Sequence, residues 1–378
     1  MRRCFLHAYS RQWRSAYRYT LIVIVFVLTL LALSIFLIFT AEYCRFLLTP
    51  VSRTQTIDYF FEPGASVHRL VADLQAKGFI QHPDFFLLLA YWKGATNKLK
   101  TGEYVFVAGL TPGQLLDQML VGNVILHRFT IVEGWTFQQL ITALKALPDI
   151  HHPLNQVSPE HVLIQLSLPP QNPEGLFFPA TYYFSLGGED TDLLKRSYHR
   201  LEKKLNQMWT TRVAHLPYKT PYEALIAASL VEKETALSQE QPMIAGVIAR
   251  RLEKAMPLQI DASIIYGLGP AYTGKLTIDD LRKDTPYNTY TRRGLPPTPI
   301  AMPSVRAIDA VLHPDQSENL YFVAKGDGSH QFSRNLVQHN VAVQRYQIDK
   351  RYPRMEKKIK RCSSLWYLSK TIKMLVCS

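Results

Sequence analysis

The stretch TPYEALIAASLVEKET, residues 220–235, predicts a capped helix with one apolar face. Thr220 has the hydroxyl expected of an N-cap, Pro221 suits the first helical turn, and Glu223 completes a capping box. At about 100° of rotation per residue, four side chains share one apolar arc. They are Ile226, Ala227, Leu230 and Val231. We therefore expect this face to pack against a core.

The two glutamates near the end of this helix occupy different faces. Glu234 falls inside the apolar arc, whereas Glu232 falls on the opposite, solvated side. Because burial disfavours a charged carboxylate, the position of Glu234 predicts a raised pKa. A carboxyl that keeps its proton near neutral pH can act as a general acid. The alternative for Glu234 is a buried structural ion pair.

A series of longer motifs follows this helix in a fixed order. They are IAGVIARRLEKAMPLQID (244–261), IIYG (264–267), DTPYNTYT (284–291), GLPPTPIAMP (294–303), HP (313–314), YFVA (321–324), GSHQF (328–332) and NLVQHN (335–340). Together with ASLVEKET (228–235), this series closely resembles the endolytic transglycosylases of the MltG (YceG-like) family. The resemblance covers about residues 50–345 and is strongest over 224–341.

The resemblance implies an enzyme that cuts β-1,4 bonds between N-acetylmuramic acid and N-acetylglucosamine in nascent peptidoglycan strands. The products would carry 1,6-anhydro-muramic ends, and the cuts would terminate strand elongation. The second glutamate of the Glu-Lys-Glu-Thr motif is catalytic in this family, which is Glu234 here. Peptidoglycan strands and, at the membrane, peptidoglycan synthases are the implied partners. The family's frequent Gln-Thr-Asp-Pro reads QIDA (259–262) here, a change that affects loop stiffness more than chemistry.

The Pro/Gly-rich stretch after this helix offers polar groups that could hold a glycan. The candidates for substrate binding are Gln259, Asp261, Asn288, Tyr290 and His330. Each has a structural alternative: turn formation for Asn288 and Tyr290, and a loop cap for Asp261, which could also be the second carboxyl of a hydrolase. His330 follows a hairpin-like turn, where a histidine is usually structural.

Three strand–turn–helix units precede the catalytic region. GASVHRLVADL (64–74), GLTPGQLLDQM (109–119) and GWTFQQLITAL (134–144) each place a Ser or Thr cap before an apolar helix face, after a strand-like stretch. The pattern resembles the LysM-type wall-binding module, although such units also recur by chance. We expect a LysM-like module over 50–147 and a catalytic domain over 148–345. The aromatic stretch FFPATYYF (177–184) could line a glycan groove or fill a core.

Residues 19–41 form an uncharged, apolar run of the length that spans a bilayer. Five arginines precede it, which predicts a cytoplasmic N-terminus at 1–18 and an exported body in the periplasm. A cleaved signal peptide would have a shorter apolar core and a small-residue site, so we expect an uncleaved inner-membrane anchor. Cysteines are absent between residues 45 and 361, which leaves the body without a disulfide framework.

The net charge of +13 lies at the two ends of the chain. The arginines before Tyr19 and the basic residues from Arg345 onward account for all of it, and the body between them is neutral. We therefore expect no nucleic-acid partner. The tail, 346–378, reads either as a basic amphipathic segment on an anionic membrane or as a solvated end.

The sequence therefore predicts an α+β protein with a single N-terminal transmembrane helix, a LysM-like α+β module and a mixed α+β catalytic domain. Histidines lack paired ligand spacing, so neither a metal nor another cofactor is expected. The competing functions are a non-catalytic peptidoglycan-binding scaffold and a muramidase that adds water.

Overall fold

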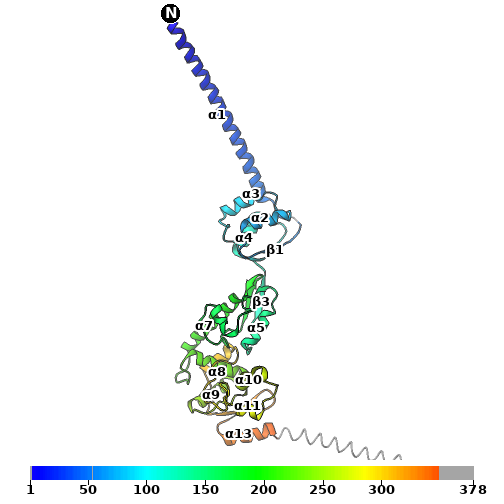
Figure 1. The fold of residues 1–378 in the computed structure, drawn as a ribbon, viewed down its shortest axis with the longest axis vertical. Helices are drawn as coiled ribbons and strands as arrows, with labels where there is room; N and C mark the ends of the chain where they lie inside the picture. Colours follow the sequence, from blue (N-terminus) through cyan, green and yellow to red (C-terminus); the bar gives the residue numbers. More distant parts are fainter. Residues whose placement is uncertain (1, 53, 349–378) are drawn as a thin grey trace, which may run out of the picture. The chain divides into compact units, whose positions relative to one another are not determined.

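The computed structural model describes residues 2–52 and 54–348, with the backbone alone for residues 2–18 (Figure 1). The chain divides into two compact units. The first comprises residues 1–127 with 185–187, and the second comprises 128–184 and 188–378. The predicted basic tail from residue 349 onward lies outside the described residues.

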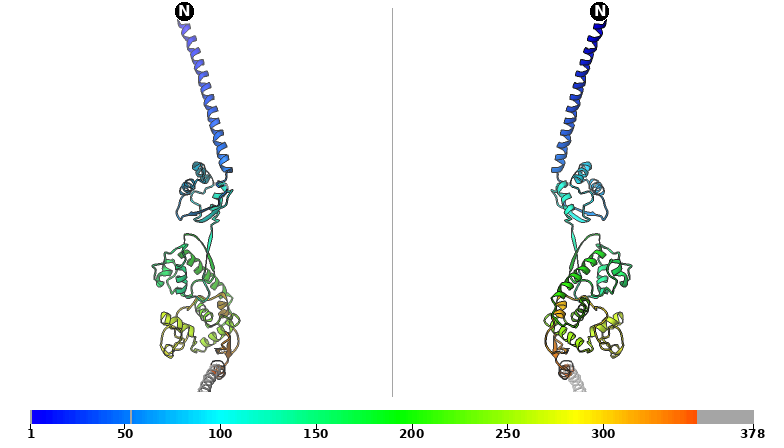
Figure 2. Two further views of the ribbon diagram at one scale, coloured as in Figure 1. Left: turned by 90° about the vertical axis from the view of Figure 1, so that its right-hand side faces the viewer. Right: turned by 90° about the vertical axis from the view of Figure 1, so that its left-hand side faces the viewer.

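Helix α1 (Arg2–Leu48) is one continuous helix (Figure 2). Within the described residues, its stretch Tyr19–Leu48 is the one helix long and apolar enough to cross a membrane. The hydroxyls of Thr29, Ser34 and Thr40 each donate to the carbonyl three residues earlier, at 2.8–2.9 Å. Their polar groups are therefore satisfied within the helix, as a hydrocarbon environment requires.

The helix continues past the end of the predicted apolar run at Ala41. Phe46 is buried in the core of the first unit, and Tyr43 packs edge-on against Phe85, with ring centroids 5.6 Å apart. The last turns of α1 thus belong to the folded unit, because their aromatic side chains find partners there.

The first unit is a two-stranded sheet with three further helices. Its elements are β1 (Ile57–Phe61), α2 (Val67–Ala76), α3 (Pro83–Trp92), β2 (Gly102–Phe106) and α4 (Pro112–Val121). The strands are antiparallel, with Ile57 opposite Phe106. Alternate strand residues, including Tyr59 and Tyr104, are buried with the apolar faces of the helices. The pattern of strand alternation and helix periodicity thus builds one small core.

The three predicted capped helices are all present. Ser66, Thr111 and Thr136 are the N-caps of α2, α4 and α5 (Phe137–Lys145), and each accepts from the backbone N–H three residues later. The third of these helices, α5, belongs to the second compact unit and not to the expected module over 50–147. The apolar face of α5 packs in the larger core, and the division falls at residues 127 and 128.

The second unit is mainly helical, with short strands. Its elements are β3 (Leu126–Thr130, which begins at the division), α5, β4 (Ile150–His151), η1 (Pro159–His161), α6 (Val162–Gln165), β5 (Thr181–Ser185), β6 (Gly188–Glu189), α7 (Asp190–Thr210), α8 (Pro221–Glu234), α9 (Gln241–Glu253), α10 (Asp261–Leu268), η2 (Gly269–Ala271), α11 (Ile278–Arg282), α12 (Val305–Leu312), β7 (Tyr321–Ala324), β8 (His330–Ser333), α13 (Leu336–Val343) and η3 (Gln344–Ile348). Strand β3 pairs with β5, β4 with β6, and β7 with β8. The rings of Phe177, Phe178, Tyr182 and Phe184 fill the core.

Helix α8 is buried on every side rather than along one arc. All residues from Ala224 to Val231 are buried, because α7, α9, α10 and α12 pack around the helix (Figure 1). Thr220 caps it as predicted, by accepting from the N–H of Glu223. The reciprocal half of the capping box is absent, since the Glu223 carboxylate accepts instead from the N–H of Lys219, at 2.6 Å.

Candidate active site

An open cleft of about 510 Å³ lies in the second unit, where α8 ends. Glu234, Gln259, Asp261, Tyr290 and His330 all line it. Its other walls come from three places: the end of α9 at Arg251 with the following Leu258, the β7 residues 321–324, and the stretch from Leu336 to Gln347. The structure thus brings five of the six predicted site residues together.

Glu234 is the last residue of α8 and is half-buried in this cleft. Its carboxyl accepts no hydrogen bond from the residues that the structure describes. Burial, and secondarily the negative charge of Asp261, raises the pKa of Glu234 to about 7. At neutral pH this carboxyl is therefore partly protonated, and none of the described residues accepts its proton in a hydrogen bond.

Asp261 opens α10 and faces the same cleft. Its carboxylate accepts a 2.6 Å hydrogen bond from the hydroxyl of Tyr290. Burial, followed by this hydrogen bond and the charge of Asp261, raises the pKa of Tyr290, so the tyrosine remains a donor. The pair keeps a negative charge near Glu234, and this charge favours the protonated form of Glu234.

Gln259 is held in place by its neighbours. Its backbone has a φ of 57°, a left-handed conformation that costs a residue with a side chain about 1 kcal/mol or more. Its N–H donates to the carbonyl of Thr289, and its side-chain oxygen accepts from Arg251 at 3.1 Å. Arg251 also donates to three backbone carbonyls, and its guanidinium lies 5.0 Å from the Tyr321 ring centre. This network fixes the loop between α9 and α10.

Asn288 does not line the cleft, in contrast to its predicted role in substrate binding. It is 1% exposed, and its amide nitrogen donates to the carbonyls of Asp280, Leu281 and Lys283. Its side-chain oxygen accepts from the N–H of Tyr290. Every polar group of this side chain is used to shape the loop that carries Tyr290, which is the structural alternative for this residue.

Glu232 is also placed differently from the prediction of a solvated residue. It is half-buried, and its carboxylate accepts from both the N–H and the hydroxyl of Ser304, at 3.0 and 2.6 Å. Ser304 is the N-cap of α12. Glu232 therefore joins α8 to the start of α12, where a negative charge is favourable.

Two further groups that hold cleft residues in place were not predicted from the sequence. One is Arg251, described above. The other is Glu240, the 8% exposed residue before α9, which holds His330 through two hydrogen bonds. Acidic residues are common near helix N-termini, so nothing local in the sequence distinguishes Glu240.

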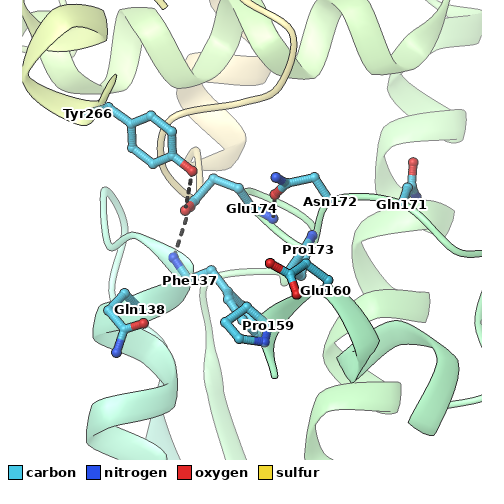
Figure 3. Close-up of a pocket in the computed structure, with 9 residues that line it drawn as sticks. All are labelled: Phe137, Gln138, Pro159, Glu160, Gln171, Asn172, Pro173, Glu174 and Tyr266. Atoms are coloured by element: carbon cyan, nitrogen blue, oxygen red, sulfur yellow. Dashed lines mark hydrogen bonds between the residues drawn. The ribbon is translucent and has the colours of Figure 1, made fainter. Parts of the chain in front are cut away.

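A second cavity of about 460 Å³ lies beside α5 and the far end of α10 (Figure 3). Glu174, 3% exposed, forms part of its wall and lies in the proline-rich stretch 169–175. Its carboxyl accepts from the N–H of Phe137 at 2.9 Å and from the hydroxyl of Tyr266 at 3.1 Å (Figure 3). Burial raises the pKa of Glu174 to about 7, although these hydrogen bonds and the charge of Lys233 oppose the shift.

Among the residues that the structure describes, no group of three His, Cys, Asp or Glu side chains could hold a metal ion. A carboxyl with a raised pKa and no hydrogen-bond partner among the described residues, beside a second carboxylate in an open groove, is an arrangement that suits general-acid chemistry.

The YceG-like family model matches residues 60–345, which is more than half of the chain. The chain belongs to the YceG-like family, as the resemblance in the sequence indicates. It is 29% identical over 332 residues to a Bacillus subtilis (strain 168) protein named endolytic murein transglycosylase. The aligned region covers 80% of this chain and 89% of that relative. A Streptococcus pneumoniae D39 protein of the same name is 29% identical over 311 residues, 73% of this chain and 56% of the longer relative.

A solved structure of a yceG-like protein from Listeria monocytogenes is also similar. It is 26% identical, covers 76% of this chain and 99% of that chain, and has a TM-score of 0.47.

Proposed function

We propose that this chain is an endolytic murein transglycosylase of the cell wall. The observation that carries the proposal is the position of Glu234 in an open cleft, where it has a pKa of about 7 and no hydrogen-bond partner among the described residues. The names of the curated relatives support the same activity. The bond cleaved is the β-1,4 linkage between N-acetylmuramic acid and N-acetylglucosamine, and cleavage of nascent strands ends their elongation.

Glu234 acts first as an acid and then as a base. Its proton passes to the glycosidic oxygen as the bond to C1 breaks and positive charge develops on the muramic ring. The resulting carboxylate removes the proton from the C6 hydroxyl of the same sugar, and that oxygen bonds to C1. The new end is a 1,6-anhydro ring, Glu234 regains its proton, and no water is consumed.

Asp261 supports this chemistry without forming a bond to the sugar. Its negative charge raises the pKa of Glu234 and lies where it can stabilise the developing positive charge. Gln259 and Tyr290 supply amide and hydroxyl groups at the cleft wall for the N-acetyl and hydroxyl groups of the strand. Their positions are set by Arg251 and Asn288 respectively.

The second candidate function is a muramidase that adds water. The presence of Asp261 beside Glu234 favours it, because hydrolases of glycans often use two carboxyl groups. The hydroxyl of Tyr290 already donates to one oxygen of Asp261, at 2.6 Å, so we assign this carboxylate an electrostatic role.

We also propose that the remaining parts of the chain hold the enzyme at the membrane. We assign α1 as an uncleaved, single-pass inner-membrane anchor with the arginine-rich end in the cytoplasm and the cleft in the periplasm. The unit β1–α2–α3–β2, two antiparallel strands around two helices, is assigned a LysM-like role in holding peptidoglycan. This location is where synthases release new strands, and they are the proposed protein partners.

The length distribution of digested strands tests the endolytic activity. Uncrosslinked glycan strands of defined length are incubated with the purified chain and separated by size. Internal cuts should shorten the whole population without accumulation of disaccharides. Intact strands would identify a binding scaffold instead, and disaccharides released from the ends would contradict an endolytic cut.

A further inference from the structure

Glu240 forms a carboxylate–imidazole pair with His330, which lines the cleft. The backbone N–H of His330 donates to one carboxylate oxygen of Glu240 at 2.9 Å, and Nδ1 lies 2.7 Å from the other. The side chains are only 10% and 11% exposed, and the residues are 90 positions apart in the chain. A two-point attachment of this kind fixes the imidazole more firmly than a turn next to a histidine requires.

The pair determines which ring nitrogen faces the cleft. A carboxylate only accepts hydrogen bonds, so Nδ1 carries the hydrogen and Nε2 of the neutral ring carries a lone pair. The edge-on ring of Phe322, with its centroid 5.5 Å away, holds the imidazole from the side. Nε2 has no hydrogen-bond partner among the described residues and is not one of their fully buried polar atoms, so it reaches the solvent of the cleft that Glu234 also lines.

We propose that Glu240 is a positioning residue that turns His330 Nε2 into the cleft, where it accepts a hydrogen bond from a hydroxyl of the bound glycan strand. This inference rests on the proposed function, because it takes the glycan as the ligand of the cleft. Sugar hydroxyls are donors that a neutral imidazole nitrogen recognises, whereas the carboxyl of Glu234 must keep its proton for the leaving oxygen.

A pair of variants separates this role from a structural one. Glu240→Gln keeps an acceptor for the His330 N–H, but its amide donates to Nδ1 and moves the hydrogen to Nε2. His330→Asn keeps a donor toward Glu240 and removes the Nε2 acceptor. We expect each variant to reduce kcat/KM for strand cleavage about tenfold, the effect of one lost hydrogen bond, with the thermal midpoint nearly unchanged.

The more exposed pair of His313 and Asp309 is the matched control. His313 Nδ1 likewise faces a carboxylate, that of Asp309 at 3.0 Å, but its Nε2 contacts the carbonyl of Thr211. Asp309→Asn should leave kcat/KM unchanged. For the neutral ring of His330, imidazole ¹⁵N chemical shifts should show an unprotonated Nε2 in the wild type and a protonated Nε2 in Glu240→Gln. Unaltered kcat/KM in both cleft variants, or an Nε2-protonated neutral ring in the wild type, would overturn the proposal.

Binding in a Glu234→Gln background distinguishes this failure from failure of the proposed function. There, Glu240→Gln should weaken the affinity for uncrosslinked glycan strands about tenfold. If the wild type cuts no strands but this weakening is found, the proposed activity fails and the assignment of Glu240 stands. If the wild type cuts strands and neither rate nor affinity changes, the assignment of Glu240 fails alone.

Discussion

Glu234 is half-buried and Glu174 is buried in the same unit, and burial raises the pKa of each carboxyl to about 7. Their surroundings differ in every other respect. Glu174 accepts from the N–H of Phe137 and the hydroxyl of Tyr266, whereas Glu234 has no hydrogen-bond partner among the described residues. A raised pKa therefore reflects burial, whereas the hydrogen-bond partners of a carboxyl decide whether its proton is available for chemistry.

The two sites also differ in the charges near them. Lys233 lowers the pKa of Glu174, and the hydrogen bond from the first residue of α5 favours its charged form. Asp261 instead adds to the effect of burial at Glu234. The surroundings of Glu174 thus oppose its protonation, while those of Glu234 promote it, and the predictions below test this contrast.

The largest expected difference is in activity. Glu234→Gln should reduce strand cleavage by about a thousandfold or more, because the amide has no proton to donate. Glu174→Gln keeps an acceptor for the Phe137 N–H and should retain cleavage within a few fold. Initial rates on uncrosslinked strands measure both, with circular dichroism to check the fold. Equal losses in the two variants would remove the distinction between the carboxyls.

The second expected effect is on the pH dependence of the free energy of unfolding. A carboxyl whose pKa rises from 4.5 to about 7 on folding binds its proton more tightly in the folded state. The free energy of unfolding therefore falls as pH rises through this window, by about 3 kcal/mol for each group. Glu234→Gln and Glu174→Gln should each remove the contribution of one carboxyl to this loss of stability. Urea denaturation at pH 5 and pH 8 would measure the change in the free energy of unfolding. A double variant with the wild-type pH dependence would contradict the raised pKa values.

A smaller effect is expected at Asp261. Asp261→Asn preserves an acceptor for the Tyr290 hydroxyl but removes the charge that helps to raise the pKa of Glu234. The pH above which cleavage declines should move down by up to about one unit, and the rate at pH 8 should fall up to about tenfold. A pH profile of kcat/KM measures this shift. Complete loss of cleavage at all pH values would instead support Asp261 as a second catalytic carboxyl.

The smallest effect is expected at Glu232, the neighbour of Glu234 with a structural role. Glu232→Ala removes the acceptor for the N–H and hydroxyl of Ser304 and should destabilise the protein by about 1 kcal/mol. Cleavage at temperatures below the transition should persist. Thermal denaturation and a strand assay on the same sample test both statements, and an inactive but equally stable variant would show that the wrong glutamate was assigned.

Features set by contacts along a few residues could be predicted from the sequence. The caps Ser66, Thr111, Thr136 and Thr220 bind N–H groups three residues away, and Glu234 lies at the end of the predicted helix. The family motifs also located four cleft residues besides Glu234.

Features set by distant contacts could not be predicted. Glu232 bonds to Ser304, 72 residues away, Glu240 to His330, 90 away, and Glu174 to Tyr266, 92 away. The position of Asn288 could not be predicted for a related reason. Its amide donates to three backbone carbonyls that come together only in the folded loop. Helix α8 looked amphipathic because small residues such as Ala224 and Ala228 are compatible with either exposure or close packing.

The mass of the new strand ends tests the central claim most directly. Uncrosslinked strands are digested in ¹⁸O-labelled water by the wild type and by Glu234→Gln, and the products are weighed by mass spectrometry. The wild type should yield ends that lack one water per cut and carry no label, and Glu234→Gln should leave the strands intact. Labelled, hydrated ends from the wild type, or cleavage by Glu234→Gln at the wild-type rate, would contradict the assignment of Glu234 as the acid and base of a transglycosylase.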